Sequence, residues 1–283
     1  MKLHIDYHAR YCYEEPVSLS PHLVRIFPRR DQFLQVANLK FSSNESADIK
    51  FRRDLFDNEI AHCFYPDPIQ DLDFYLQAEL DITERNPFGF LLAGSALNIP
   101  VKYSDLEKEI LAPYLRPHEA CELPDPLRPA GERPTVETLV NFNSWIYEQL
   151  GYERRDEGDP FLPSETLSRG QGSCRDFGVL LAEVLRQNGI ATRLASGFLW
   201  EGEKEEGKPK VAESAMHAWV ESYLPGAGWL AMDPTNGSFT DHSAITTAAG
   251  LYHENIAPVS GHYYGKKTIP SHLETKLEVK LIE

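Results

Sequence analysis

Several features are scarce in this 283-residue sequence, and each absence excludes a class of protein. The chain has four cysteines, Cys12, Cys63, Cys121 and Cys174, and no two of them form a C-x-x-C pair. Scattered thiols of this kind exclude a dense disulfide framework and a cysteine-rich zinc ligand set, and they favour a reducing compartment. We therefore expect a chain that holds no metal and no cofactor.

Basic residues are also in the minority. Lysine and arginine number 28 against 43 aspartates and glutamates, so the formal net charge is −15 and the pI is near 5.1. This balance argues against binding nucleic acid or an anionic membrane through a basic face. The N-terminus has no apolar leader core, and no segment approaches the ~20 apolar residues of a membrane span. We expect a cytoplasmic protein and leave its oligomeric state open.

In the first hundred residues, apolar and polar positions alternate. This two-residue period is that of a half-buried β-strand. Residues with turn-forming side chains separate the alternating segments. These segments are 2–13, 22–27, 34–41, 49–53, 60–65 and 71–82. We predict an antiparallel β-sandwich and assign residues 1–115 to it.

A proline-rich stretch follows at residues 116–134, where five prolines fix φ and remove backbone donors. We predict a linker there and a second domain over residues 135–283. Apolar residues at helical spacing predict a helix from Thr135 to Gly151, and a second helix is followed by strands. The expected fold class is α+β.

The most informative segment runs from Ser168 to Gly189 and contains Cys174. Its apolar residues recur at helical spacing, which predicts a buried amphipathic helix that begins near Ser173 or Cys174 and ends at Gly189. Cys174 then lies in the first helical turn, where unpaired N–H groups and the helix dipole stabilise a thiolate and can donate to an oxyanion. A lone cysteine is usually a small buried apolar residue, but this position indicates a reactive thiol.

A proton acceptor for such a thiol lies in a predicted hairpin over residues 217–233. His217 is on the first strand and Asp233 ends the second, so the carboxylate can orient the imidazole and stabilise its charged form. In an antiparallel pair, the numbers of directly opposed residues add to the same sum along both strands. His217 and Asp233 share a face of the sheet only if that sum is even. We therefore predict a three- or five-residue connection, or a β-bulge, between the strands.

Three short motifs thus stand in order: Gly-x-Cys-Arg-Asp-Phe at 172–177, His-Ala-Trp at 217–219 and Asp-Pro-Thr at 233–235. This set closely resembles the catalytic core of bacterial transglutaminase-like proteins, whose fold is similar to that of papain-type thiol enzymes. The resemblance covers about residues 135–260. The N-terminal half also resembles the β-rich domain that precedes this core in many bacterial members, and residues 21–28 are similar to its early strand region.

The resemblance implies that Cys174 is the nucleophile, His217 the base and acid, and Asp233 the orienting carboxylate. Besides the backbone N–H of Cys174, it implies an upstream aromatic as a second oxyanion donor, either Tyr152 or Trp145. The implied function is that of a thiol enzyme, a cysteine peptidase, amidase or acyltransferase. Such an enzyme cleaves or exchanges a peptide or protein amide through a thioester.

The alternative is a catalytically silent module that keeps this fold and binds a peptide or protein through its β-rich domain. An enclosed Cys174 with no open groove beside it would favour that alternative. An accessible thiol next to the histidine would favour the enzyme.

Overall fold

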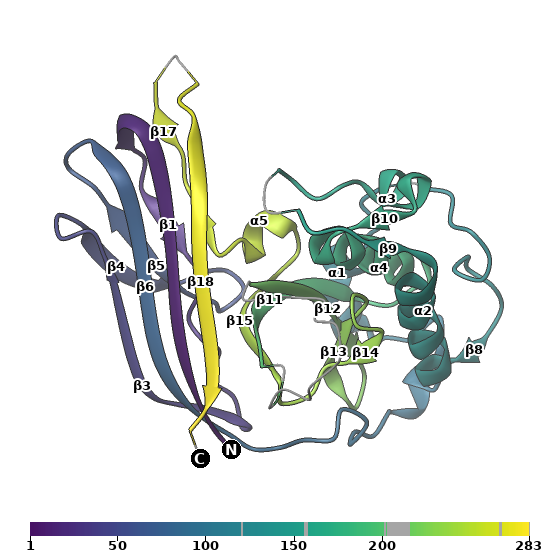
Figure 1. Cartoon of the computed structure of the whole chain (residues 1–283). Coiled ribbons are helices and arrows are strands. Elements are labelled where there is room, and N and C mark those ends of the chain that lie inside the picture. Colours follow the sequence, from purple (N-terminus) through teal and green to yellow (C-terminus); the bar gives the residue numbers. More distant parts are fainter. Residues whose placement is uncertain (120, 156–157, 201, 203–215, 266–267, 283) are drawn as a thin grey trace.

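The computed structural model describes residues 1–119, 121–155, 158–200, 202, 216–265 and 268–282. Two regions of different architecture pack side by side, a β-sandwich and an α+β core (Figure 1). Among the helices in the described ranges, none is both long and apolar enough to traverse a bilayer.

The sandwich consists of two antiparallel sheets, as predicted. In the first sheet β3 (Leu34–Ser43), β6 (Ile69–Ile82), β1 (Lys2–Leu19) and β18 (Ser271–Leu281) lie in that order, and β17 (Tyr263–Tyr264) pairs with the end of β1. In the second sheet the order is β16 (Val259–Ser260), β2 (His22–Val24), β5 (Glu59–Phe64) and β4 (Asp48–Arg53). Along β1 the odd-numbered residues Leu3, Ile5, Tyr7 and Ala9 are buried, so the sequence alternation becomes one apolar face.

The end of the chain returns to this sandwich, which corrects the predicted assignment of residues 135–283 to the core. Strand β18 pairs with β1 from Leu3 opposite Leu281 to Tyr13 opposite Ser271. The short strands β16 and β17 pair with β2 and β1. The edge of β1 offers unpaired backbone groups that only a distant segment can satisfy, and local sequence does not reveal that partner.

Residues 94–134 also lie elsewhere than predicted, because they pack on the core. This stretch contains η1 (Gly94–Ala96), β7 (Asn98–Ile99), α1 (Asp105–Leu115) and β8 (Arg133–Pro134). Leu111 of α1 and the linker residues Leu123 and Leu127 are buried in the core's apolar cluster. The prolines do keep most of residues 116–134 out of regular structure, but burying these side chains fixes the segment against the core.

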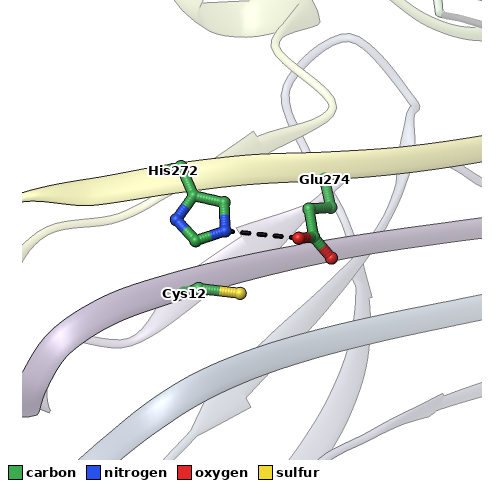
Figure 2. Close-up of side chains that lie close together, drawn as sticks. All are labelled: Cys12, His272 and Glu274. Carbon is green, nitrogen blue, oxygen red and sulfur yellow. Dashed lines mark hydrogen bonds and ion pairs between the residues drawn. The ribbon is translucent and has the colours of Figure 1, made fainter.

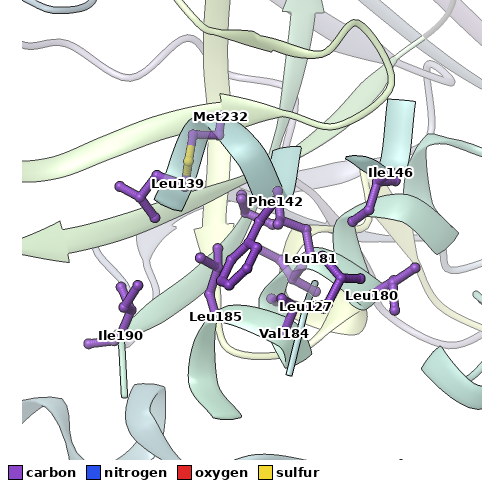
Figure 3. Close-up of a cluster of buried hydrophobic side chains, with 14 of the residues drawn as sticks. Leu127, Leu139, Phe142, Ile146, Leu180, Leu181, Val184, Leu185, Ile190 and Met232 are labelled. Atoms are coloured by element: carbon purple, nitrogen blue, oxygen red, sulfur yellow. The ribbon is translucent and has the colours of Figure 1, made fainter. Parts of the chain in front are cut away.

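The core is built around helix α4 (Cys174–Gln187) and a five-stranded antiparallel sheet. The sheet order is β14 (Ser238–Phe239), β13 (Gly228–Asp233), β12 (His217–Leu224), β11 (Thr192–Leu199) and β15 (Ala244–Gly250). Helix α2 (Thr135–Gln149) packs on α4, and their apolar faces meet at Phe142 and Leu181 (Figure 3). The predicted helices begin and end within about two residues of those observed, because their apolar stripes face this cluster.

The sandwich and the core share buried contacts along β11 and β15. Phe198 of β11 and Ile245 of β15 belong to the sandwich's apolar cluster, and the rings of Phe198 and Tyr7 lie 5.6 Å apart. The fully buried Asn58 donates to the Ala249 carbonyl at 2.8 Å and accepts from the Ala249 N–H at 2.9 Å. These contacts hold the sandwich against the face of the core that carries the site described next.

Candidate active site

Cys174 is the first residue of α4, at the helix start that the sequence predicts. The preceding Ser173 donates its backbone N–H and its hydroxyl to Asp176 Oδ2, at 2.6 and 2.8 Å. A Cβ atom at Gly172 would lie 2.8 Å from the Asp176 Cβ, so glycine is required for this tight turn. The turn leaves Cys174 partly exposed, with its thiol at the end of the helix dipole.

The buried Asp176 also fixes the segment that precedes the helix. Its Oδ1 accepts from Arg155 Nη2 and from the Phe161 N–H, both at 2.7 Å. Burial alone would raise the pKa of Asp176, but the N–H groups of Ser173 and Phe161, with Arg155, lower it. The carboxylate therefore stays charged and ties Arg155 and Phe161 to the turn that carries Cys174.

His217 and Asp233 meet through the hairpin register that the sequence predicts. Leu224 pairs with Gly228 and Val220 with Met232, so residues 225–227 form a three-residue connection. The predicted register is confirmed, and the two side chains share one face of the sheet. His217 Nε2 lies 2.8 Å from Asp233 Oδ2, and both residues are almost completely buried.

Asp233 is held by groups that follow it in the chain. The Thr235 N–H donates to Asp233 Oδ1 at 2.8 Å, and Asn236 Nδ2 donates to Oδ2 at 2.7 Å. Asn236 is a residue of the site that the sequence argument did not include. The sequence feature that could have predicted it is the turn Asp-Pro-Thr-Asn. In such turns the aspartate side chain accepts hydrogen bonds from the residues that follow it.

The charges of the three side chains depend on one another. Burial alone would raise the pKa of Cys174, but the charge and hydrogen bond of His217, with the Ala218 N–H, lower it. Burial alone would lower the pKa of His217, but Asp233 and Cys174 raise it to about 10. Burial would raise the pKa of Asp233, and His217 lowers it. The arrangement thus favours a thiolate and an imidazolium that share one proton-transfer path.

The hydrogen bonds also indicate which ring nitrogen of His217 faces which partner. Because Asp233 occupies His217 Nε2, the other ring nitrogen, Nδ1, is left to face the Cys174 thiol with which the ring is hydrogen-bonded. The carboxylate, the imidazole and the sulfur therefore form a chain in which each group holds the next. Such a chain can take a proton from the thiol and return it to a leaving group.

A cavity of about 670 Å³ opens over the thiol, and both regions of the molecule line it. From the core come Cys174, His217 and Tyr152, and from the sandwich Tyr11 of β1 and Leu273 of β18. We call this the Cys174 cavity. Its size is that of a ligand site, and the partly exposed Cys174 is among the residues that line it.

The two aromatic candidates for a second oxyanion donor lie in different places. Tyr152 ends β9 (Gly151–Tyr152), which pairs in parallel with β10 (Gln171–Gly172) just before Cys174, and it lines the Cys174 cavity. Trp145 lies on α2 and lines a separate hollow, so the structure does not bring it to Cys174. Trp145 belongs to α2, whereas Tyr152 lies on the strand that pairs with the segment just before Cys174.

Comparisons with known proteins agree with this architecture. A family model described as "Transglutaminase-like superfamily" matches residues 127–234, which include Cys174, His217 and Asp233. A second model, "Bacterial transglutaminase-like N-terminal region", matches residues 3–81. The chain belongs to the transglutaminase-like superfamily. The two matches place the superfamily core on the α4 and β12–β13 region and the bacterial N-terminal region on the sandwich.

A solved structure has a similar overall fold. The crystal structure of a "putative cysteine protease" from Cytophaga hutchinsonii superposes with a TM-score of 0.74 and 15% identity. The match covers 100% of this chain and 91% of that one, so both the sandwich and the core are included. At this identity the likeness concerns the fold.

The curated relatives match this chain over only part of their own length. An uncharacterized protein of Mycobacterium tuberculosis is 29% identical over 170 residues, which is 58% of this chain and 49% of the relative. The protein-glutamine gamma-glutamyltransferase of Pseudomonas aeruginosa is 26% identical over 193 residues, 64% of this chain and 28% of that protein. This chain therefore spans about half the length, or less, of the curated relatives it matches.

Proposed function

We propose that this protein is a thiol enzyme that cleaves or exchanges an amide bond of a peptide or protein through a thioester on Cys174. The observation that carries the proposal is the hydrogen-bonded chain from Cys174 through His217 to Asp233, which opens onto a cavity of about 670 Å³. Membership of the transglutaminase-like superfamily supports it.

In the first step the Cys174 thiolate attacks the amide carbonyl carbon, and a C–S bond forms as the carbonyl oxygen takes the negative charge. The His217 imidazolium then gives its proton to the amide nitrogen as the C–N bond breaks. An amine or ammonia leaves, and an acyl thioester remains. The paired charges at neutral pH supply both the nucleophile and the acid for this step.

In the second step neutral His217 removes a proton from water or from a second amine, which attacks the thioester carbonyl. The thiolate leaves and the imidazolium forms again, so the site returns to its starting state. Water as the acceptor gives hydrolysis, and an amine gives transamidation. Asp233 stays ionised throughout and stabilises the imidazolium, because its remaining lone pairs are held by Thr235 and Asn236.

The developing oxyanion needs donors beside the sulfur. The Cys174 backbone N–H is at the first turn of α4, where helix N–H groups have no intrahelical acceptor. Tyr152, which lines the same cavity, is our choice for the second donor. The partial exposure of Cys174 and the open cavity favour this enzyme over the silent binding module.

Mass spectrometry of a peptide library tests the proposal. The library includes glutamine-containing peptides, because the Pseudomonas aeruginosa relative is a protein-glutamine gamma-glutamyltransferase. Incubated with the protein and a primary amine, the peptides are expected to lose ammonia, gain the amine or be cut in the backbone. Each product selects a different reaction within the proposal.

The same reactions are run with Cys174→Ala and with Cys12→Ser, which removes a thiol outside the triad. With no divalent cation added, we expect no product with Cys174→Ala and unchanged product with Cys12→Ser. Product formation by Cys174→Ala at the rate of the natural chain would disprove the thioester mechanism. An unreactive Cys174 in the natural chain, assayed with iodoacetamide at neutral pH, would instead support the silent binding module.

A further inference from the structure

A second group of metal-binding residue types lies on the outward face of the sandwich, where strands from the two ends of the chain meet. Cys12 of β1 pairs directly with His272 of β18, and Glu274 is two residues farther along β18. Residues two apart on a strand share a face, so all three side chains project from the same side of the sheet. Figure 2 shows them converging, with His272 Nε2 at 3.3 Å from Glu274 Oε1.

The distances between the potential ligand atoms suit a tetrahedral ion. One sulfur, one nitrogen and one oxygen atom from these residues all lie within 4.8 Å of one another. Zinc bonds of about 2.0–2.3 Å place neighbouring ligand atoms about 3.5 Å apart, so small side-chain rotations bring them into range. Two of the ligands, His272 and Glu274, are about two-thirds exposed, and their rotamers can therefore adjust.

The surroundings favour a cation. Asp71 of β6 pairs with Cys12 on the opposite side from His272 and is hydrogen-bonded to its thiol. Arg10, which forms an ion pair with Asp71 at 3.1 Å and pairs with Glu274 across the strands, and Lys276, two residues along β18, are positive groups beside the cluster. Three carboxylates, those of Asp71, Asp73 and Glu274, lie in the same region. The local charge is therefore negative before any thiol is ionised.

We propose that Cys12, His272 and Glu274 bind a thiophilic divalent cation such as Zn²⁺, with a fourth position taken by water or by Asp71. Thiolate, imidazole and carboxylate are the ligand types that zinc uses in proteins. The ligands come from opposite ends of the chain, which is why cysteine spacing does not predict the site.

Binding involves no change of oxidation state. The Cys12 thiol releases its proton to solvent as the S–metal bond forms. His272 Nε2 exchanges its hydrogen bond with Glu274 for a bond to the metal, and Glu274 binds through the oxygen that is freed. The affinity is therefore expected to fall as the pH is lowered, because protons compete for the ligands.

The position of the site suggests its consequence. Cys12 is the last residue of the regular pairing between β1 and β6 before the register shifts, and His272 lies near the start of β18. A bound cation would cross-link β18 to β1 there. His272 itself and the neighbouring Tyr11 and Leu273 line the Cys174 cavity, so the cation would also fix this wall of the cavity.

Spectroscopy with Co²⁺ tests the site, on untagged protein with Cys174→Ala so that the triad contributes no thiolate. We expect one Co²⁺ per chain and a thiolate-to-cobalt charge-transfer absorption, displaced by Zn²⁺. The absorption should vanish in Cys12→Ser and weaken in His272→Ala. It should be unchanged in His4→Ala, a matched control on the same face of β1. Absence of the band, or its persistence in Cys12→Ser, would overturn the proposal.

Two further measurements need no substitution, so their outcome does not depend on whether a variant folds. Stoichiometric Zn²⁺ is expected to slow alkylation of Cys12 about tenfold or more, because a bound thiolate is protected. It should also slow hydrogen exchange of residues 271–275. Unchanged alkylation and exchange at saturating Zn²⁺ would each contradict the site. Neither readout requires catalysis, so the outcome is independent of the proposed enzyme function.

Discussion

The molecule contains two groups of one cysteine, one histidine and one carboxylate, and they differ in the state of the thiol. In the core, the cationic His217 and the Ala218 N–H outweigh burial and lower the pKa of Cys174. On the sandwich, partial burial, the hydrogen bond to Asp71 and the charge of Glu274 raise the pKa of Cys12. Residue types alone therefore do not define the chemistry, because the charge nearest the sulfur decides it.

The two groups also differ in how their atoms are arranged. In the core, Cys174 and Asp233 bind opposite nitrogens of one buried imidazole, which is an arrangement for moving a proton. On the sandwich, Cys12, His272 and Glu274 point at a common space on an exposed face, which is an arrangement for sharing one ion. These arrangements support the proposals of covalent chemistry at the first group and cation binding at the second.

The largest effect expected from this comparison is that of Cys174→Ala. We expect the amide reaction to fall by about 10³-fold or more, because the thioester can no longer form. The melting temperature should stay within a few degrees, since the side chain is small and partly exposed. Product formation is followed by mass spectrometry and folding by circular dichroism. An equal loss in Cys12→Ser would break the distinction between the two thiols.

Asp233→Asn should have the next largest effect, lowering the rate about 10²- to 10⁴-fold. The amide is nearly the same size but cannot stabilise the imidazolium or fix its tautomer. The rate with a glutamine peptide is compared with that of Glu274→Gln, the matching change in the other group. With no divalent cation added, we expect Glu274→Gln to keep the rate of the natural chain, and a similar loss in both variants would refute the assignment.

Alkylation compares the two thiols directly. At neutral pH iodoacetamide should modify Cys174 about 10- to 100-fold faster than Cys12, because only Cys174 has a lowered pKa. Peptide mapping after short labelling times gives both rates. Faster labelling of Cys12 would contradict the pKa directions on which the comparison rests.

The pH dependence of these rates sharpens the comparison further. For Cys174 the alkylation rate should fall only as acid protonates the thiolate, with a midpoint below the ordinary thiol value, and His217→Ala should move that midpoint upward. The amide reaction should also fall at high pH, as His217 loses its proton near pH 10. Cys12 should show a midpoint above the ordinary thiol value. A shared midpoint for the two thiols would be inconsistent with the structure.

The smallest effect concerns the support of the nucleophile turn. Asp176→Asn should lower the free energy of unfolding by roughly 1–3 kcal/mol, because it removes a buried charge that Arg155 and two backbone N–H groups bind. Urea unfolding measures this change. The rate should fall less than in Asp233→Asn, since Asp176 positions the turn but does not contact the thiol chemistry. A fall in rate larger than that in Asp233→Asn would indicate that Asp176 takes part in the reaction directly.

The sequence predicts the local elements well where one face of each is buried. The alternation in β1 and the helical spacing in α4 each match the observed element, and the hairpin register follows from requiring His217 and Asp233 on one face. The division of the chain into domains is less well predicted. Burial of Leu111, Leu123 and Leu127 draws residues 94–134 onto the core. That Tyr152 lines the Cys174 cavity and Trp145 a separate one likewise depends on tertiary packing, including that of β9 against β10.

By itself, then, the sequence determined the sandwich strands of the first hundred residues, the helix that begins near Cys174 and the register that joins His217 to Asp233. These depend on periodicity and turn chemistry between residues close together in the chain. Only the tertiary structure decided that β18 closes the sheet on β1, that Asp176 ties the Arg155 segment to the nucleophile, and that Cys12 meets His272. Those contacts join distant segments, and they depend on which sheet edges and apolar surfaces remain uncovered once the local elements have formed.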